Sequence, residues 1–191
     1  MPVDDDLILD AAVDELRAYG LRRTSVDNVA RRAGLSRATV YRRFENKNVL
    51  VQAALVRESA RFFGEIVAAI GPLPTVRERL VEGFVVGLRM VRTDALLTRL
   101  LVSDPEELVP YLTLRGAGVI AAASEFLVAQ YEQVAGPQMA RDPMSRDPRV
   151  LAEMLVRLAI SFTLTPTGVV AVDDDAAVRR FADSYLAPLL S

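Results

Sequence analysis

Hydrophobic residues recur along most of this chain at intervals of three and four positions, the spacing that places them on one face of a helix. The alternation typical of strands is not convincing anywhere, and only the short run Val169–Val172 is β-like. The pattern therefore predicts an all-α protein, in which capping residues, glycines and prolines separate about nine helices. Residues 106–108 and 136–148 are predicted to form a turn and a loop. The predicted helices cover residues 4–20, 26–33, 37–44, 47–70, 75–92, 94–102, 110–135, 149–165 and 174–190.

The segment Thr24–Leu55 carries the most specific local signals. Thr24 or Ser25 offers a side-chain oxygen that caps a first helix, and Gly34 ends it because glycine readily adopts the positive φ of a C-terminal cap. Ser36 then caps a second helix of only about two turns. Two helices joined by a glycine-containing turn, the second short and exposed, are typical of a helix-turn-helix unit. The second helix is therefore predicted to read DNA.

The amphipathic helix predicted over residues 4–20 supplies a third wall for this unit, because two short helices cannot bury enough apolar surface alone. Asn46 is predicted to cap the next helix, which links the small unit to the rest of the chain. We therefore predict a three-helix DNA-binding domain over residues 1–48. A larger helical bundle is predicted over residues 49–191.

Positive charge is concentrated in the same segment. The chain has a net charge of −2, but residues 22–47 carry eight basic and two acidic side chains, a local charge of +6. A basic patch on an otherwise acidic chain is typical of a DNA-binding surface, although charge alone is also compatible with an ordinary solvated helix. The basic residues are Arg22, Arg23, Arg31, Arg32, Arg37, Arg42, Arg43 and Lys47, and the acidic ones are Asp27 and Glu45.

Lys47, the only lysine of the chain, is predicted to be the first residue of the helix over 47–70. A cation at a helix N-terminus opposes the helix dipole, so its position calls for an explanation. A DNA phosphate held jointly by the lysine and the free amide groups would supply one. An ordinary exposed lysine is the alternative.

The composition argues against an enzyme. Cysteine and histidine are both absent, so the usual thiol nucleophile, general base and transition-metal ligands are missing. We predict no catalytic site, no metal and no cofactor. No apolar run reaches the roughly 20 residues of a membrane span, and the acidic residues Asp4–Asp6 are unlike a secretory signal. We therefore expect a cytoplasmic protein without a membrane partner.

From Thr24 to Leu55 the sequence resembles the TetR family of bacterial transcriptional regulators. The remaining residues resemble the family only in helical character and length. The resemblance implies an all-helical homodimer with an N-terminal DNA-binding domain and a C-terminal ligand-sensing and dimerisation domain. The residues that carry it are Thr24, Val29, Ala30, Ala33, Gly34, Leu35, Ser36, Thr39, Val40, Tyr41, Phe44, Lys47 and Leu50.

The resemblance also implies particular DNA contacts. Arg37 and Arg42 match exposed positions of the reading helix, where arginine commonly contacts guanine. Thr39 is expected to contact a thymine methyl group or a phosphate, and Tyr41 and Lys47 match positions that hold the DNA backbone. The predicted DNA-binding set is Thr24, Ser25, Arg37, Ala38, Thr39, Tyr41, Arg42, Arg43 and Lys47.

The last two predicted helices are apolar on more than one side, as Leu155 and Met154 illustrate in the first and Phe181 and Leu186 in the second. Such helices are either fully internal or shared with a partner. In a chain of this length we predict a two-fold homodimer through residues 149–165 and 174–190. Paired reading helices would then reach two DNA half-sites.

These observations predict a transcriptional repressor that a small-molecule effector releases from DNA. A DNA-binding dimer without an effector and an activator remain open, because a closed apolar bundle and a ligand pocket use the same residue types. Arginines such as Arg89, Arg115 and Arg157 are candidates for binding an anionic ligand if they face inward. The candidate effector pocket, in which plain core packing is the alternative for each residue, comprises Phe62, Phe84, Leu88, Met90, Leu112, Arg115, Phe126, Met154 and Phe162.

Overall fold

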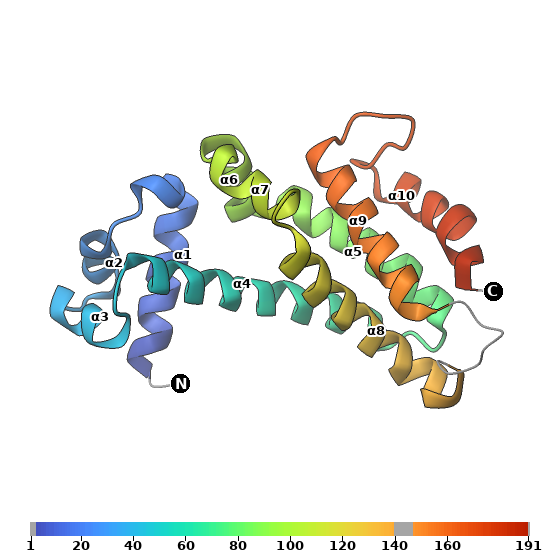
Figure 1. Cartoon of the computed structure of the whole chain (residues 1–191), viewed down its shortest axis with the longest axis horizontal. Helices are drawn as coiled ribbons and strands as arrows, with labels where there is room; N and C mark the ends of the chain where they lie inside the picture. Colours follow the sequence, from blue (N-terminus) through green and yellow to red (C-terminus); the bar gives the residue numbers. More distant parts are fainter. Residues whose placement is uncertain (1–2, 140–146, 191) are drawn as a thin grey trace. The chain divides into compact units, whose positions relative to one another are not determined.

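The computed structural model describes residues 3–139 and 147–190, and every regular element within these ranges is a helix (Figure 1). The predicted all-α class is therefore confirmed. A π-helical turn, η1 (Ala182–Leu186), and a 3-10 turn, η2 (Ala187–Leu190), follow the last α-helix. The α-helices are α1 (Val3–Arg23), α2 (Val26–Ala33), α3 (Arg37–Arg43), α4 (Lys47–Ile70), α5 (Val76–Thr93), α6 (Ala95–Ser103), α7 (Pro105–Leu112), α8 (Ala117–Met139), α9 (Pro148–Leu164) and α10 (Asp175–Phe181).

The chain divides into two compact units, and the division falls inside α4. Residues 1–62 and 94–109 form the first, called here the N-terminal unit. Residues 63–93 and 110–191 form the second, the C-terminal unit. The predicted boundary between residues 48 and 49 is a division by function and stays a prediction. The structural division differs from it because α6 and most of α7 belong with the N-terminal unit.

The core of the N-terminal unit is built on the apolar face of α1. Ile8 and Leu16 of this helix are fully buried. They share one hydrophobic cluster with Val29 of α2, Val40 of α3 and residues of α6 such as Leu100. The third wall predicted for the helix-turn-helix unit is thus present, and α6 packs on the same helix as a further wall.

Gly20 marks the bend at which α1 loses helical geometry, with a φ of 78°. Its backbone lies so close to α6 and α7 that an added Cβ would come within 2.0 Å of Oδ2 of Asp104. The same oxygen accepts a hydrogen bond from the amide of Leu21 at 3.0 Å. Both the positive φ and the close approach require glycine here, so the predicted end of the regular helix at Gly20 is explained by a contact far away in sequence.

The core of the C-terminal unit is aliphatic and aromatic. Val85 of α5 and Val178 of α10 are fully buried at its centre. Around them lie Phe84, Phe162 and Phe181, whose ring centroids are 5.6–6.4 Å apart. Such separations suit tilted and edge-to-face aromatic packing. The unit is therefore held together by the apolar faces of α5, α9 and α10.

The helix predicted over residues 110–135 is wrong at its start. Pro105 begins the short helix α7, with acidic residues in its first turn that suit the positive end of the helix dipole. Pro110 lies inside α7 instead of starting a helix. The chain then turns before α8, with the amide of Arg115 donating to the carbonyl of Pro110 at 2.7 Å. Pro105 and Pro110 each suit the first turn of a helix, and the sequence-based prediction started the helix at Pro110.

Two further differences concern helix ends. The break in α8 falls at Gly136, where φ is 74°, close to the predicted end of that helix. Most of the predicted loop, residues 140–146, lies outside the described residues. The regular helix predicted over residues 174–190 is wrong in its second half, where η1 and η2 replace it. Pro188 explains the irregularity, because proline lacks an amide hydrogen and its ring clashes with the carbonyl four residues earlier.

Among the described residues, no single helix is long and apolar enough to cross a membrane, although the bent pair Pro105–Leu112 and Ala117–Gly136 passes by length and composition when taken together.

Candidate nucleic-acid interface

Helix α3, which is predicted to read DNA, is positioned by caps on each side of the turn that precedes it. Oγ of Ser25 accepts a hydrogen bond from the amide of Asn28 at 3.2 Å and starts α2. Gly34 ends α2 in the left-handed conformation, with φ 69° and ψ 24°. Oγ of Ser36 then accepts from the amide of Thr39 at 3.1 Å and starts α3. The three caps lie where the sequence predicts them, and they fix the turn between α2 and α3.

Helix α3 is anchored on one side and exposed on the other. Val40 is 1% exposed, and Phe44, the C-cap of α3, is 9% exposed. Both belong to the core of the N-terminal unit. Thr39 is partly exposed. The other predicted contact residues of this helix all reach the surface on the face away from the core, and they are Arg37, Ala38, Tyr41, Arg42 and Arg43.

The two predicted base readers have different surroundings. The guanidinium of Arg37 lies 5.3 Å from the centre of the Tyr41 ring and pairs with Asp27 of α2. A hydrogen bond with Tyr41 and the nearby carboxylate of Asp27 raise the pKa of Arg37 above its ordinary value. Arg42 has no hydrogen-bond or ion-pair partner among the described residues. Each of the other seven basic residues in the segment 22–47 has a hydrogen-bond or ion-pair partner.

The remaining predicted backbone contacts lie near the ends of α3. Arg43 pairs with Asp5 of α1 at 3.4 Å. Lys47 is the first residue of α4, as predicted, and its Nζ donates a hydrogen bond to the carbonyl of Arg22 at 3.1 Å. Asn46 caps that helix by accepting from the amide of Val49 at 3.1 Å, also as predicted. Lys47 is thus held beside the end of α1 with two of its three protons still available.

Thr24 is a buried member of the predicted DNA-binding set. Its side chain is 3% exposed, and its hydroxyl donates a hydrogen bond of 2.6 Å to the carbonyl of Gly20. The hydroxyl therefore stabilises the chain between Gly20 and α2, and a DNA contact by Thr24 stays a prediction.

Several residues that support the interface were missed by sequence reasoning. Glu15 of α1 is 1% exposed and accepts a hydrogen bond from Nδ2 of Asn28 at 2.6 Å. Asn28 in turn accepts from Arg31, and Glu15 also faces Arg32 at 3.6 Å. The signal in the sequence is that Glu15 occupies a position on the apolar stripe of α1, between Ala12 and Leu16. A charged residue on a buried stripe indicates a buried polar network.

The nine residues of the predicted effector pocket have different surroundings, and their role as a pocket stays a prediction. Phe84, Leu88 and Phe162 lie in or against the core of the C-terminal unit, and the ring of Phe126 lies 4.5 Å from that of Phe63. Arg115 is exposed in the turn before α8. Met154 is 52% exposed and lines a hollow on the surface of this unit. Phe62, Met90 and Leu112 are partly buried.

The arginines considered as ligand-binding groups have other partners or face solvent. Arg89 and Arg92 of α5 both donate to Asp175 at the start of α10, at 3.0 and 2.7 Å. The hydrogen bond from Arg92 is the largest of the effects that lower the pKa of the Asp175 carboxyl. Arg157 donates to Glu153 one turn earlier in α9 at 2.8 Å. In the described residues these side chains stabilise the surface of the C-terminal unit, and no group of His, Cys, Asp and Glu side chains with metal-binding geometry occurs there.

Comparison with known proteins gives the same class as the fold. Residues 8–54 match the family described as bacterial regulatory proteins, tetR family. Residues 76–183 match the bacterial tetracyclin repressor C-terminal domain. The chain therefore belongs to the TetR family, and it is a transcriptional regulator with a helix-turn-helix DNA-binding domain. The curated relatives are transcriptional regulators, and the family binds operator DNA as dimers.

The relatives cover nearly the whole chain. An uncharacterized HTH-type transcriptional regulator of Mycobacterium tuberculosis is 29% identical over 183 residues, which is 96% of this chain and 85% of that protein. The regulator AlkX of the same organism is 27% identical, covering 94% of this chain and 85% of AlkX. A crystal structure described as the TetR family repressor AlkX from a Dietzia strain, implicated in biodegradation of n-alkanes, is 26% identical with a TM-score of 0.68. It covers 100% of this chain and 98% of that one.

Proposed function

We propose that this regulator is a repressor whose homodimer binds operator DNA through α3 and is released by a small apolar effector bound in the C-terminal unit. The observation that carries the DNA-binding part is the exposed basic face of a rigidly capped α3. The repressor role is supported by the similarity to the Dietzia AlkX repressor over the whole chain. The cytoplasm, where the chromosome lies, is the proposed site of action.

The proposed DNA contacts divide into readers and holders. Arg37 and Arg42 read base edges from the two ends of α3, and Thr39 between them contacts a thymine methyl group or a phosphate. Ala38 lies beside Arg37 and Thr39 on the exposed part of the helix. Tyr41 and Lys47 hold the backbone, with Ser25 and Arg43 as further phosphate contacts. The holders set the register of α3 on the duplex, and the readers set the preferred sequence.

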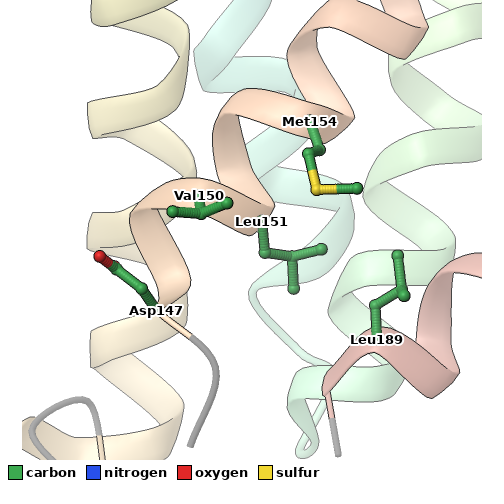
Figure 2. A pocket seen from close by; sticks show the side chains of 5 residues that line it. All are labelled: Asp147, Val150, Leu151, Met154 and Leu189. Atoms are coloured by element: carbon green, nitrogen blue, oxygen red, sulfur yellow. The ribbon is translucent and has the colours of Figure 1, made fainter.

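Exposed apolar side chains support dimerisation through α9 and the end of the chain. Val150, Met154 and Tyr185 are 58%, 52% and 68% exposed. Figure 2 shows Met154 and Leu151 pointing toward the same space as Leu189 of η2, where they line a hollow of about 280 Å³. A cluster of this kind on a folded protein marks a protein interaction site, and a second copy related by a two-fold axis covers it on both subunits. The predicted dimer through residues 149–165 and 174–190 remains our proposal.

The effector site is proposed for the interior of the C-terminal unit, within the functional domain of residues 49–191. Its aliphatic and aromatic core, which includes Phe84 and Phe162, has the lining that an apolar ligand needs. The relative implicated in n-alkane biodegradation makes a long alkyl chain the first effector class to test. The segment 94–109 supports the coupling, because it packs in the N-terminal unit while both of its ends continue into the C-terminal unit. A ligand that shifts those ends would also displace α1 and the helix-turn-helix unit.

Selection of bound sites from random DNA tests the proposal, followed by titration of n-alkanes, alkanols and fatty acids of increasing length against the complex. An operator that is bound without ligand and released by one of these compounds supports a ligand-released repressor. Thermal melts run in parallel distinguish a sensor, whose melting temperature rises with its ligand, from an effector-free dimer. DNA binding that appears only after ligand addition would show an activator-like or co-repressed protein instead.

A further inference from the structure

Asp27 and Arg37 join the two helices of the helix-turn-helix unit through their side chains. Oδ1 of Asp27 lies 3.1 Å from Nε of Arg37, and Oδ2 accepts a hydrogen bond from Nη1 at 3.4 Å. The opposite side of the guanidinium is held by Tyr41, one helical turn along α3, through ring stacking and a long hydrogen bond from Nη2 to the phenol oxygen. Arg37 is therefore fixed by one contact from α2 and a second contact from its own helix.

The ion pair is placed where it can contribute little to stability. The side chains of Arg37 and Asp27 are 62% and 61% exposed. Exposed pairs of this kind stabilise a fold by about 0–1 kcal/mol. Asp27 is also one of only two acidic residues in the segment 22–47, and a carboxylate on a DNA-binding face repels phosphates. Asp27 lies in the first turn of α2, where the helix dipole favours an acidic residue. That preference explains the acid but not its pairing with Arg37 of the next helix.

Arg42 provides an internal comparison on the same helix. It is exposed and has no hydrogen-bond or ion-pair partner among the described residues. A free arginine can turn toward either a phosphate or a base, whereas a guanidinium fixed on both sides presents its remaining donors in one direction. A guanidinium that is fixed before binding loses less conformational entropy when it binds its partner. It also cannot turn toward a partner in another direction, so it binds that partner less tightly.

We propose that Asp27 is a specificity-determining positioning residue, which holds Arg37 in the orientation that reads one base pair of the operator and keeps it from following the phosphate backbone. The proposal rests on the proposed role of α3 as the DNA reader and extends it to a residue of α2 outside the predicted contact set. Asp27 acts through Arg37 and lowers binding to unrelated DNA, so it exchanges general affinity for selectivity.

The test compares Asp27→Ala with Glu45→Ala in the full-length protein. Glu45 is the other acid of the segment and is exposed without a partner among the described residues, so the control removes the same charge without touching Arg37. Each variant is titrated with the selected operator and with a scrambled duplex at several salt concentrations. A melting curve checks that each variant is folded. Because both sites are exposed, we expect both variants to fold.

For Asp27→Ala we expect the ratio of operator to scrambled-DNA affinity to fall roughly five- to tenfold. Binding to scrambled DNA should tighten about two- to threefold, with a salt dependence steeper by up to about one unit of slope, because the freed Arg37 reaches a phosphate. Glu45→Ala should leave the ratio unchanged, since a general charge effect acts on both duplexes alike.

A double-mutant comparison separates positioning from direct reading. In an Arg37→Ala background, Asp27→Ala should no longer change the ratio. A ratio that still falls in that background would show that Asp27 itself contacts a base, and the proposal would be wrong. An unchanged ratio in the wild-type background would also overturn it. If no enriched DNA site can be selected with the wild-type protein, the proposed function fails first, which is a different outcome from either of these.

Discussion

The two units differ in how their interiors are held together. The buried polar side chains of the described residues are Glu15, Thr24 and Asp104, and all three lie in the N-terminal unit. The core of the C-terminal unit is aliphatic and aromatic, and two polar atoms buried in that unit, Nη1 of Arg92 and Oγ of Ser124, have no hydrogen-bond partner within the described part of the chain. Satisfied polar networks specify one arrangement of a core, whereas apolar cores tolerate repacking. The first property suits the proposed DNA reader, and the second suits the proposed ligand-binding domain.

The largest difference should appear when glycines of the two units are replaced. Gly20→Ala forces a side chain into positive φ and against Asp104, which also removes the hydrogen bond from Leu21. We expect a loss of about 3–5 kcal/mol in the free energy of unfolding, measured by denaturant titration.

Two other glycines serve as controls. Gly34→Ala has the same problem of positive φ but no atom within 4 Å of the added Cβ, so it should cost only about 1–2 kcal/mol. Gly118→Ala in α8 has open space and helical φ and should be neutral or slightly stabilising. Equal effects of Gly20→Ala and Gly34→Ala would mean that the approach to Asp104 is unimportant.

A second comparison removes one core side chain from each unit. Glu15→Ala leaves Asn28 without its buried acceptor and should cost about 2–4 kcal/mol. Phe162→Leu in the aromatic cluster should cost about 1 kcal/mol, because the neighbouring rings can close part of the space. Denaturant unfolding followed by circular dichroism measures both, and a more sensitive C-terminal unit would reverse the account of the two cores.

The predicted DNA contacts of α3 and of the start of α4 should give an intermediate effect on binding without a change in stability. Arg42→Ala should weaken operator binding by about 1–3 kcal/mol and relax one base position. Lys47→Ala should weaken binding to all sequences alike and lower the salt slope by about one. Fluorescence anisotropy with operator and scrambled duplexes distinguishes them, and a sequence-dependent loss for Lys47→Ala would move that residue from holder to reader.

The smallest effect concerns acid stability of the C-terminal unit. Arg92 and Arg89 lower the pKa of Asp175, so this carboxyl contributes stability above its unfolded pKa and the contribution is lost as pH falls through the lowered folded value. Asp175→Asn should therefore reduce the slope of melting temperature against pH only in the acid range, and modestly because the pair is partly exposed. An effect at neutral pH that grows with rising pH would contradict this sign.

The parts of the fold that were predicted from sequence are those set by neighbouring residues. The caps at Ser25, Gly34, Ser36 and Asn46 each depend on atoms within a few positions, and the structure has them where the sequence predicted them. The contact between Asp104 and Leu21 spans 83 positions and left no local signal except an acid before a proline. The start of α7 was missed because Pro105 and Pro110 are both good helix starts, and local sequence does not distinguish them.

The features of the site also divide into those set by neighbouring residues and those set by contacts distant in sequence. The outward face of α3 was predictable from spacing and charge, whereas the Asp27–Arg37 pair joins two helices and needs the turn geometry. The burial of Thr24 was not predictable, because a buried threonine and a surface threonine before a helix look alike in sequence. The effector residues remain a prediction, since apolar residues that line a pocket and those that fill a core are alike in sequence.

Sequencing of DNA bound from a random library is the most direct test of the account. A dimer that reads through α3 should enrich an inverted repeat, with half-site centres about one helical turn or a multiple of it apart. With Arg42→Ala the same repeat should return with one position degenerate in each half. Enrichment of a single asymmetric site, or of no sequence at all, would contradict the paired, sequence-reading helices on which the account depends.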